Sequence, residues 1–96
     1  MKVNIKKEFA QDYTTRQAGE KLRKMILESS EEVELDFSHL KVASASFFDE
    51  SIGKLPEEDG GKEALKKIKI SQIHDLDYDL LVHVCQTRGI KAPERL

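Results

Sequence analysis

Hydrophobic and polar residues alternate in three short stretches of the chain. The apolar members of these stretches are Val3, Ile5 and Phe9, then Val33, Leu35 and Phe37, and finally Ile68 and Ile70. The residues between them are lysine, asparagine or acidic residues. A period of two is the pattern of a β-strand that buries only one face. The alternation therefore predicts three strands, each with one apolar and one charged face.

Between and after these strands, apolar residues recur at helical spacing. The three sets are Ala18, Leu22, Met25 and Ile26; Phe48, Ile52 and Leu55; and Leu76, Leu80, Leu81, Val84 and Cys85. Thr14 and Gln17 fit a capping box at the start of the first helix, and Pro56 is expected to end the second. Asp75 can cap the third helix, and Gly89 with Ile90 fits a Schellman stop.

The order of these elements is β-α-β-α-β-α, which predicts an α/β fold. Right-handed crossovers make neighbouring strands parallel, with the second strand in the middle. Because each strand has a charged face, we expect a two-layer domain whose helices cover one face of a mainly parallel sheet. Residues 57–61 read as a polar loop and residues 91–96 as a loose tail. The whole chain, 1–96, is expected to form a single domain.

Composition narrows the function classes. The net charge of -2 provides no basic field for nucleic acid, and no apolar stretch is long enough to span a membrane. The single cysteine, Cys85, allows no intramolecular disulfide and lies on an apolar helix face, so we expect a buried, unreactive thiol in a cytoplasmic protein. His39, His74 and His83 have no metal-ligand spacing, so neither a metal nor a cofactor is expected.

The segment from Glu34 to Glu50 carries the strongest functional signal. It combines an acidic strand end, a turn rich in small hydroxyl residues, and the start of a helix. Ser46 and Asp49 fit a capping box, with Ser44 two residues earlier in the turn. One interpretation is that both serines only cap and shape the turn. The other is that Ser46, or as second choice Ser44, accepts a phosphate, which would change the charge that a partner meets.

This segment resembles STAS-like domains, the family of bacterial anti-sigma-factor antagonists, and in particular their uncharacterised STAS-like relatives. The resemblance rests on the Leu-Asp-Phe-Ser strand of residues 35–38 and the Ser-x-Ser-Phe-x-Asp-Glu run of residues 44–50, and it extends from about Thr15 to Arg88. At the four positions of the antagonists' Asp-Ser-Ser/Thr-Gly turn this chain has Ser44, Ala45, Ser46 and Phe47. The resemblance implies a regulatory, non-enzymatic domain in bacterial signalling and a partner of the histidine-kinase-like ATPase class.

The candidate docking surface is the turn and helix of residues 42–55. Phe47 and Phe48 are adjacent and cannot face the same way on a helix. We expect Phe48 in the core. Phe47 is either a second core contact or, where it is partly exposed, a binding anchor. The partner-binding candidates are Asp36, Ser38, Phe47, Asp49 and Glu50.

Two other classes of function compete with this interpretation. The chain could be a constitutive structural subunit or a homodimer, in which case the serines are caps and the charged sheet face is an interface. The other class is an enzyme or small-ligand carrier, which would need a concave pocket with convergent polar groups. An enzyme is not expected, because no Ser-His-Asp or Cys-His pair can be placed and Gly60-Gly61-Lys62 does not fit a phosphate-binding loop.

Overall fold

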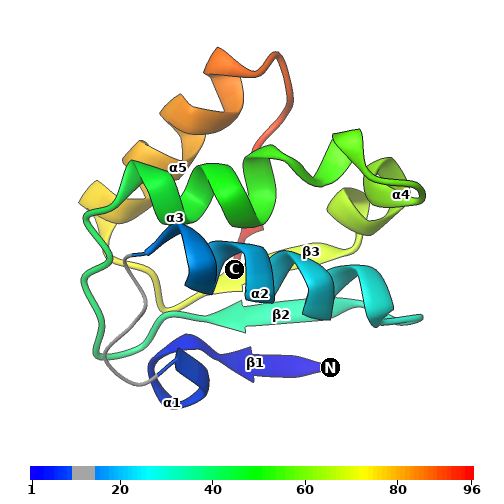
Figure 1. Cartoon of the computed structure of the whole chain (residues 1–96). Helices are drawn as coiled ribbons and strands as arrows, with labels where there is room; N and C mark the ends of the chain where they lie inside the picture. The colour runs from blue at the N-terminus through cyan, green and yellow to red at the C-terminus, as the bar shows by residue number, and fades with distance from the viewer. Residues whose placement is uncertain (10–14) are drawn as a thin grey trace.

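The computed structural model describes residues 1–9 and 15–96 and contains a four-stranded parallel sheet. The strands are β1 (Lys2–Asn4), β2 (Val33–Asp36), β3 (Ile68–Ser71) and β4 (Glu94–Arg95), in the spatial order β1-β2-β3-β4. Helix α3 (Ala45–Phe48) packs against both α2 (Arg16–Glu28) and α5 (Asp75–Thr87), as Figure 1 shows. The two-layer α/β fold predicted from the sequence is confirmed.

Both ends of the chain differ from their predicted structure. Ile5 does not extend the first strand, because helix α1 (Ile5–Phe9) begins there and turns Ile5 and Phe9 into the core. Residues 91–96 are not a loose tail. They form β4 beside β3, and the Leu96 N–H donates to the Ile70 carbonyl at 2.7 Å. The sheet therefore has one strand more than the alternation predicts, and β2 and β3 are both central.

Helix α2 (Arg16–Glu28) packs closely on residues 45–53, the segment that follows the turn of residues 42–46. Thr15 is its N-cap and accepts a hydrogen bond from the Ala18 N–H, whereas the predicted cap, Thr14, lies outside the described residues. A Cβ atom at Gly19 would lie 2.7 Å from the Glu50 Cβ and 2.8 Å from the Phe47 carbonyl oxygen. A glycine in mid-helix is unfavourable by itself, so its presence here is explained by this close approach.

The predicted second helix consists of three shorter elements. An α-helical turn, α3 (Ala45–Phe48), continues into a π-helical turn, η1 (Asp49–Gly53), and then into a 3₁₀ turn, η2 (Leu55–Glu57). Pro56 lies within η2 instead of ending the helix. The predicted polar loop at 57–61 leads into a further helix, α4 (Gly61–Lys66). A Cβ at Gly61 would overlap the Leu55 carbonyl oxygen at 1.6 Å, so only glycine fits there.

Helix α5 (Asp75–Thr87) ends as the sequence predicts, but it begins and packs differently. Ile90 N–H donates to the Cys85 carbonyl and Gly89 N–H to the Gln86 carbonyl, which is a Schellman motif with Gly89 at a φ of 70°. The N-cap is His74, not Asp75. Leu76 is 72% exposed and takes no part in the core. Cys85 is fully buried, and this burial raises the pKa of its thiol to about 11.

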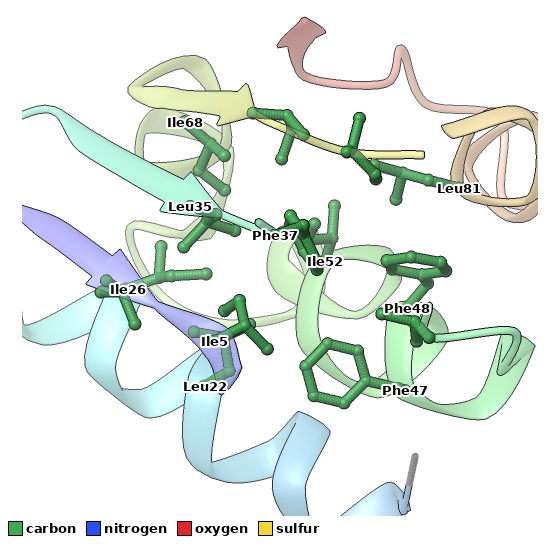
Figure 2. Packing of buried hydrophobic residues seen from close by; sticks show 14 of the residues in the cluster. Ile5, Leu22, Ile26, Leu35, Phe37, Phe47, Phe48, Ile52, Ile68 and Leu81 are labelled. Atoms are coloured by element: carbon green, nitrogen blue, oxygen red, sulfur yellow. The ribbon is translucent and has the colours of Figure 1, made fainter. Parts of the chain in front are cut away.

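The core lies between the sheet and the helices (Figure 2). Its largest fully buried side chains are Phe37, Phe47, Phe48, Ile5, Leu22, Ile26, Leu35, Ile52, Leu55, Ile68, Ile70 and Leu81. The alternate strand residues form a polar network on the other face, in which Lys2 lies 3.6 Å from Glu34 and the Ser71 hydroxyl donates to Glu34 at 2.7 Å. In the described part of the chain, every helix is too short or too polar to traverse a membrane.

Candidate functional site

A buried carboxylate holds the candidate turn in place. Asp77, on the first turn of α5, is 4% exposed and accepts hydrogen bonds from the Val42 N–H at 2.7 Å and the Ala43 N–H at 3.0 Å. Ala43 has a φ of 47°, a left-handed conformation that is unusual for alanine. Val42 is buried beneath the turn, while Ala43 and Ala45 are exposed. The turn is therefore fixed from below and presents small side chains outward.

The helix after the turn begins two residues earlier than the capping box predicts. Ser44, not Ser46, is the N-cap of α3, and its hydroxyl accepts a hydrogen bond from the Phe47 N–H at 3.3 Å. Ser46 lies inside the first turn of the helix and is half-buried. The two serines consequently differ in role, since Ser44 shapes the turn and Ser46 lies at the surface beside it.

Phe47 is a core residue, which decides between the two alternatives in favour of the core contact and against the exposed anchor. Both Phe47 and Phe48 are 0% exposed. The Phe47 ring packs edge-on against Phe9, with ring centres 6.0 Å apart, and against Phe48 at 5.9 Å. Figure 2 shows both rings directed inward from α3. A partner cannot contact the Phe47 side chain in this conformation, so its contribution to a docking site is to position the helix.

Asp49 joins η1 to the end of α5. The Arg88 guanidinium donates to both Asp49 carboxylate oxygens, at 2.5 Å and 2.9 Å, and to Glu57 at 2.5 Å. The hydrogen bonds from Arg88 hold the pKa of Asp49 below its usual range, although partial burial opposes the shift. A carboxylate bound in this bidentate way is a structural tie and is not available as an isolated recognition charge.

Glu50 joins η1 to α2. It is 8% exposed and lies 2.7 Å from Lys54 Nζ, 3.0 Å from Arg16 Nη1 and 3.3 Å from Arg23 Nη1. Arg23 also donates to the Glu50 backbone carbonyl. The Lys54 hydrogen bond, followed by those from the arginines, lowers the pKa of Glu50 against the opposing effect of burial.

Asp36 and Ser38 lie at the end of β2, on the side of the sheet that carries the polar network. Asp36 is 7% exposed and accepts hydrogen bonds from the Ser38 N–H at 2.9 Å and from the Asn4 amide at 3.3 Å. Burial raises the pKa of Asp36, but the hydrogen bonds from Ser38 and the charge of Lys2 outweigh burial and leave the pKa lowered. Asp36 therefore shapes the loop after β2, and Ser38 is the more accessible of the two.

A groove of about 420 Å³ adjoins the turn. Its lining residues come from α2, α3, η1 and α5 and are Arg16, Ala45, Ser46, Asp49, His83, Val84, Thr87 and Arg88. Ser46 and Asp49 are thus brought to one groove, together with the basic side chains of Arg16 and Arg88. The other candidates, Asp36, Ser38, Phe47 and Glu50, do not line it.

The ion pairs of Glu50 predict a specific acid response. Because the pKa of Glu50 is lower in the folded chain than its ordinary value of 4.5, its stabilising effect is complete above that pH and disappears as the pH falls through the folded pKa. We expect Glu50→Gln to flatten the loss of unfolding free energy between about pH 5 and pH 3, measured by urea denaturation. Glu20→Gln, at an exposed i,i+4 pair with Lys24, is the control and should leave this acid slope unchanged.

Two residues that build this site were not singled out by their sequence context. Asp77 belongs to the acidic run Asp75-x-Asp77-x-Asp79, which fits an acidic first turn of a helix equally well. Only its hydrogen bonds from the Val42 and Ala43 N–H groups, which the fold creates, distinguish it. Arg88 follows the last helical turn of α5, and its partners Asp49 and Glu57 are more than thirty residues away in sequence. No local sequence pattern predicts the contacts of either Asp77 or Arg88.

Comparison with known proteins supports the family resemblance. The family model described as a STAS-like domain of unknown function (DUF4325) matches residues 18–77, which include β2, the clamped turn, α3 and the start of α5. No curated protein and no solved structure gives a significant match to the chain. In the described residues, no cluster of three or more His, Cys, Asp or Glu side chains is arranged to hold a metal ion. Since the match spans more than half of the 96 residues, the chain belongs to the family of STAS-like domains of unknown function.

Proposed function

We propose that this domain is a regulatory protein-binding module that docks its partner on the turn of residues 42–46 and the adjoining groove. The observation that carries the proposal is the clamp on the turn. A carboxylate that is 4% exposed holds two backbone N–H groups and keeps Ala43 in a left-handed conformation, while the side chains on top remain exposed. A loop fixed in this way loses little entropy when a partner binds, which favours recognition.

In this proposal, the contact residues are those that the fold leaves at the surface. Ala43 and Ala45 permit close approach of a partner, and Ser46 with Arg16 and Thr87 supplies polar contacts along the groove. Phe47 and Glu50 act indirectly, because their burial fixes α3 and η1 against α2. The expected partner is a protein of the histidine-kinase-like ATPase class, as the family resemblance implies, and the module itself needs no catalytic group.

Modification of Ser46 would regulate this docking. A phosphate on Ser46 adds about 1.5 to 2 negative charges to a groove that already contains Asp49 and is flanked by Arg16 and Arg88. It would change both the shape and the charge of the surface that the partner meets. Ser46 is preferred to Ser44, because the Ser44 hydroxyl already caps α3.

The test compares one charge change at two sites. Wild-type protein, Ser46→Asp and Ser30→Asp are used to capture partners from the source cell, with quantification by mass spectrometry and equal folding checked by thermal melting. Ser30 is exposed after the end of α2 and serves as the matched control. We expect Ser46→Asp to capture about tenfold less, or even less, of a partner that the wild type and Ser30→Asp both retain. A loss of this size is expected when a new negative charge is placed in a buried docking contact.

Equal retention of that partner by both variants would contradict docking at this turn. The alternative, a constitutive homodimer, has its own signature. In that case the wild type would elute as a stable dimer in light-scattering chromatography, and Glu34→Lys on the polar sheet face would dissociate it, whereas a monomeric wild type excludes this alternative.

A further inference from the structure

A second pocket lies beyond the carboxyl ends of the two central strands. It has a volume of about 590 Å³ and is formed by the loop after β2 and the loop after β3, with the end of β4 at its side. Its apolar wall is made by Phe37, Leu40 and Ile73. The volume lies within the range of about 300–1,000 Å³ that small-molecule sites occupy.

The polar wall of this pocket is basic. His39, Lys41, His74 and Arg95 line it; Arg95 forms an ion pair with Asp75, and the same carboxylate also interacts electrostatically with His74. Lys41 and His39 are exposed and line the pocket with no ion pair to the described residues, in a chain whose net charge is -2. Basic groups gathered in a chain that is acidic overall point to an anionic ligand.

Two of these groups are held in a defined orientation. The Arg95 guanidinium donates to the Ile73 carbonyl at 2.9 Å and to Asp75 at 2.5 Å, and it stacks on the Tyr78 ring at 5.3 Å. His74 Nδ1 accepts the Leu76 N–H at 3.4 Å, so in the neutral ring the proton lies on Nε2 and can be donated to a ligand.

The backbone on both sides of the pocket is in an uncommon conformation. His39 has a φ of 59° and Gln72 a φ of 55°, and both residues line the pocket from different loops. Left-handed residues other than glycine carry a conformational cost and concentrate at functional sites. Two such residues from different loops line the same pocket, which is an observation independent of charge and indicates that both loops have a defined shape there.

We propose that this pocket binds a small organic phosphate, in which a phosphate group is joined to an apolar ring. The phosphate would contact Lys41, His39 and the Nε2 of His74, and the ring would lie on Leu40 and Ile73. A doubly charged oxyanion suits three basic donors better than a single carboxylate charge. This site is separate from the groove beside Ser46, and the proposal holds whether or not a protein partner docks there.

The experiment titrates phenyl phosphate into the ¹⁵N-labelled full chain and follows backbone and histidine NMR signals. We expect saturable shifts centred on His39, Lys41, Gln72 and His74, with inorganic phosphate and benzoate each binding the same residues more weakly. Lys41→Gln should weaken phenyl phosphate binding about fivefold, as the loss of one partly screened charge pair implies. Lys24→Gln, on an exposed face of α2 outside the pocket, is the control and should bind like the wild type.

Several results would overturn the proposal. These are an absence of saturable shifts at these residues, equal affinity of Lys41→Gln and the wild type, or shifts spread evenly over the basic surface. Equal affinity for inorganic phosphate and phenyl phosphate would overturn the contact with the apolar wall.

Discussion

Phe47→Ala should destabilise the domain by about 3–5 kcal/mol, the usual cost of truncating a fully buried aromatic side chain. The Phe47 ring is 0% exposed and contacts Phe9 on α1 and Phe48 on α3. Its removal therefore leaves a cavity where the N-terminal segment, α3 and α2 meet. A domain of this size has a total stability of roughly 5–15 kcal/mol, so the variant should melt roughly 15–30 °C below the wild type.

The measurement is thermal and urea unfolding followed by circular dichroism. Ala45→Gly, at an exposed position of the same helical turn, is the control and should cost only about 1 kcal/mol through its effect on helix propensity. A Phe47→Ala variant with a near-native melting temperature and a specific loss of partner binding would mean that the ring leaves the core and serves as an anchor. That result would restore the binding-anchor interpretation that the sequence alone suggested.

Asp77→Ala should lower the free energy of unfolding by about 3 kcal/mol. This is more than is expected for an acidic residue that only complements the start of a helix. Its carboxylate accepts the Val42 and Ala43 N–H groups, and removing it leaves two donors without a partner, one of them buried. Each such hydrogen bond to a charged group contributes about 1.5–3 kcal/mol. Hydrogen exchange of the Val42 and Ala43 amides should accelerate together with the loss of stability.

The same run of acids provides the control. Asp79 is exposed and two residues away on the same helix, so Asp79→Ala should change stability by only about 0.5 kcal/mol. Equal effects of Asp77→Ala and Asp79→Ala would show that both residues act only on the helix dipole, and the clamp would then have no energetic role. Asp77→Asn should cause a loss of stability between those of Asp77→Ala and Asp79→Ala. Its single amide oxygen replaces the two carboxylate oxygens that accept the Val42 and Ala43 N–H groups.

The strands and the fold class are predictable from sequence because their signal is local. Alternation at 33–37 and 68–70 requires one buried face, and three such stretches separated by helical spacing leave few topologies open. The same reasoning fails at Ile5, where the alternation continues but the chain already turns into α1. It also fails for β4, because two residues that pair with β3 are too few to produce a pattern.

The elements around the candidate site were mispredicted for a different reason. Ser44 and Ser46 are both acceptable N-caps, and what selects Ser44 is the burial of Phe47 and Phe48 together, which is a tertiary effect. The π-helical turn at Asp49–Gly53 and the helix α4 are likewise fixed by packing, since α4 begins at a glycine pair that normally indicates a loop. A turn followed by helical structure does lie at residues 42–57, but its inward and outward residues are assigned wrongly when an ideal α-helix is assumed.

The shortness of the outer strands limits how any other protein can join this sheet. β1 contributes three residues and β4 two, and exposed charged side chains, Lys2 on one edge and Glu94 and Arg95 on the other, accompany them. Edges this short and charged are poor templates for an added strand, which protects the domain against edge-to-edge aggregation. These edges therefore disfavour binding by strand addition and leave the loops and helices, where contacts depend on side chains, as the surfaces open to selective recognition.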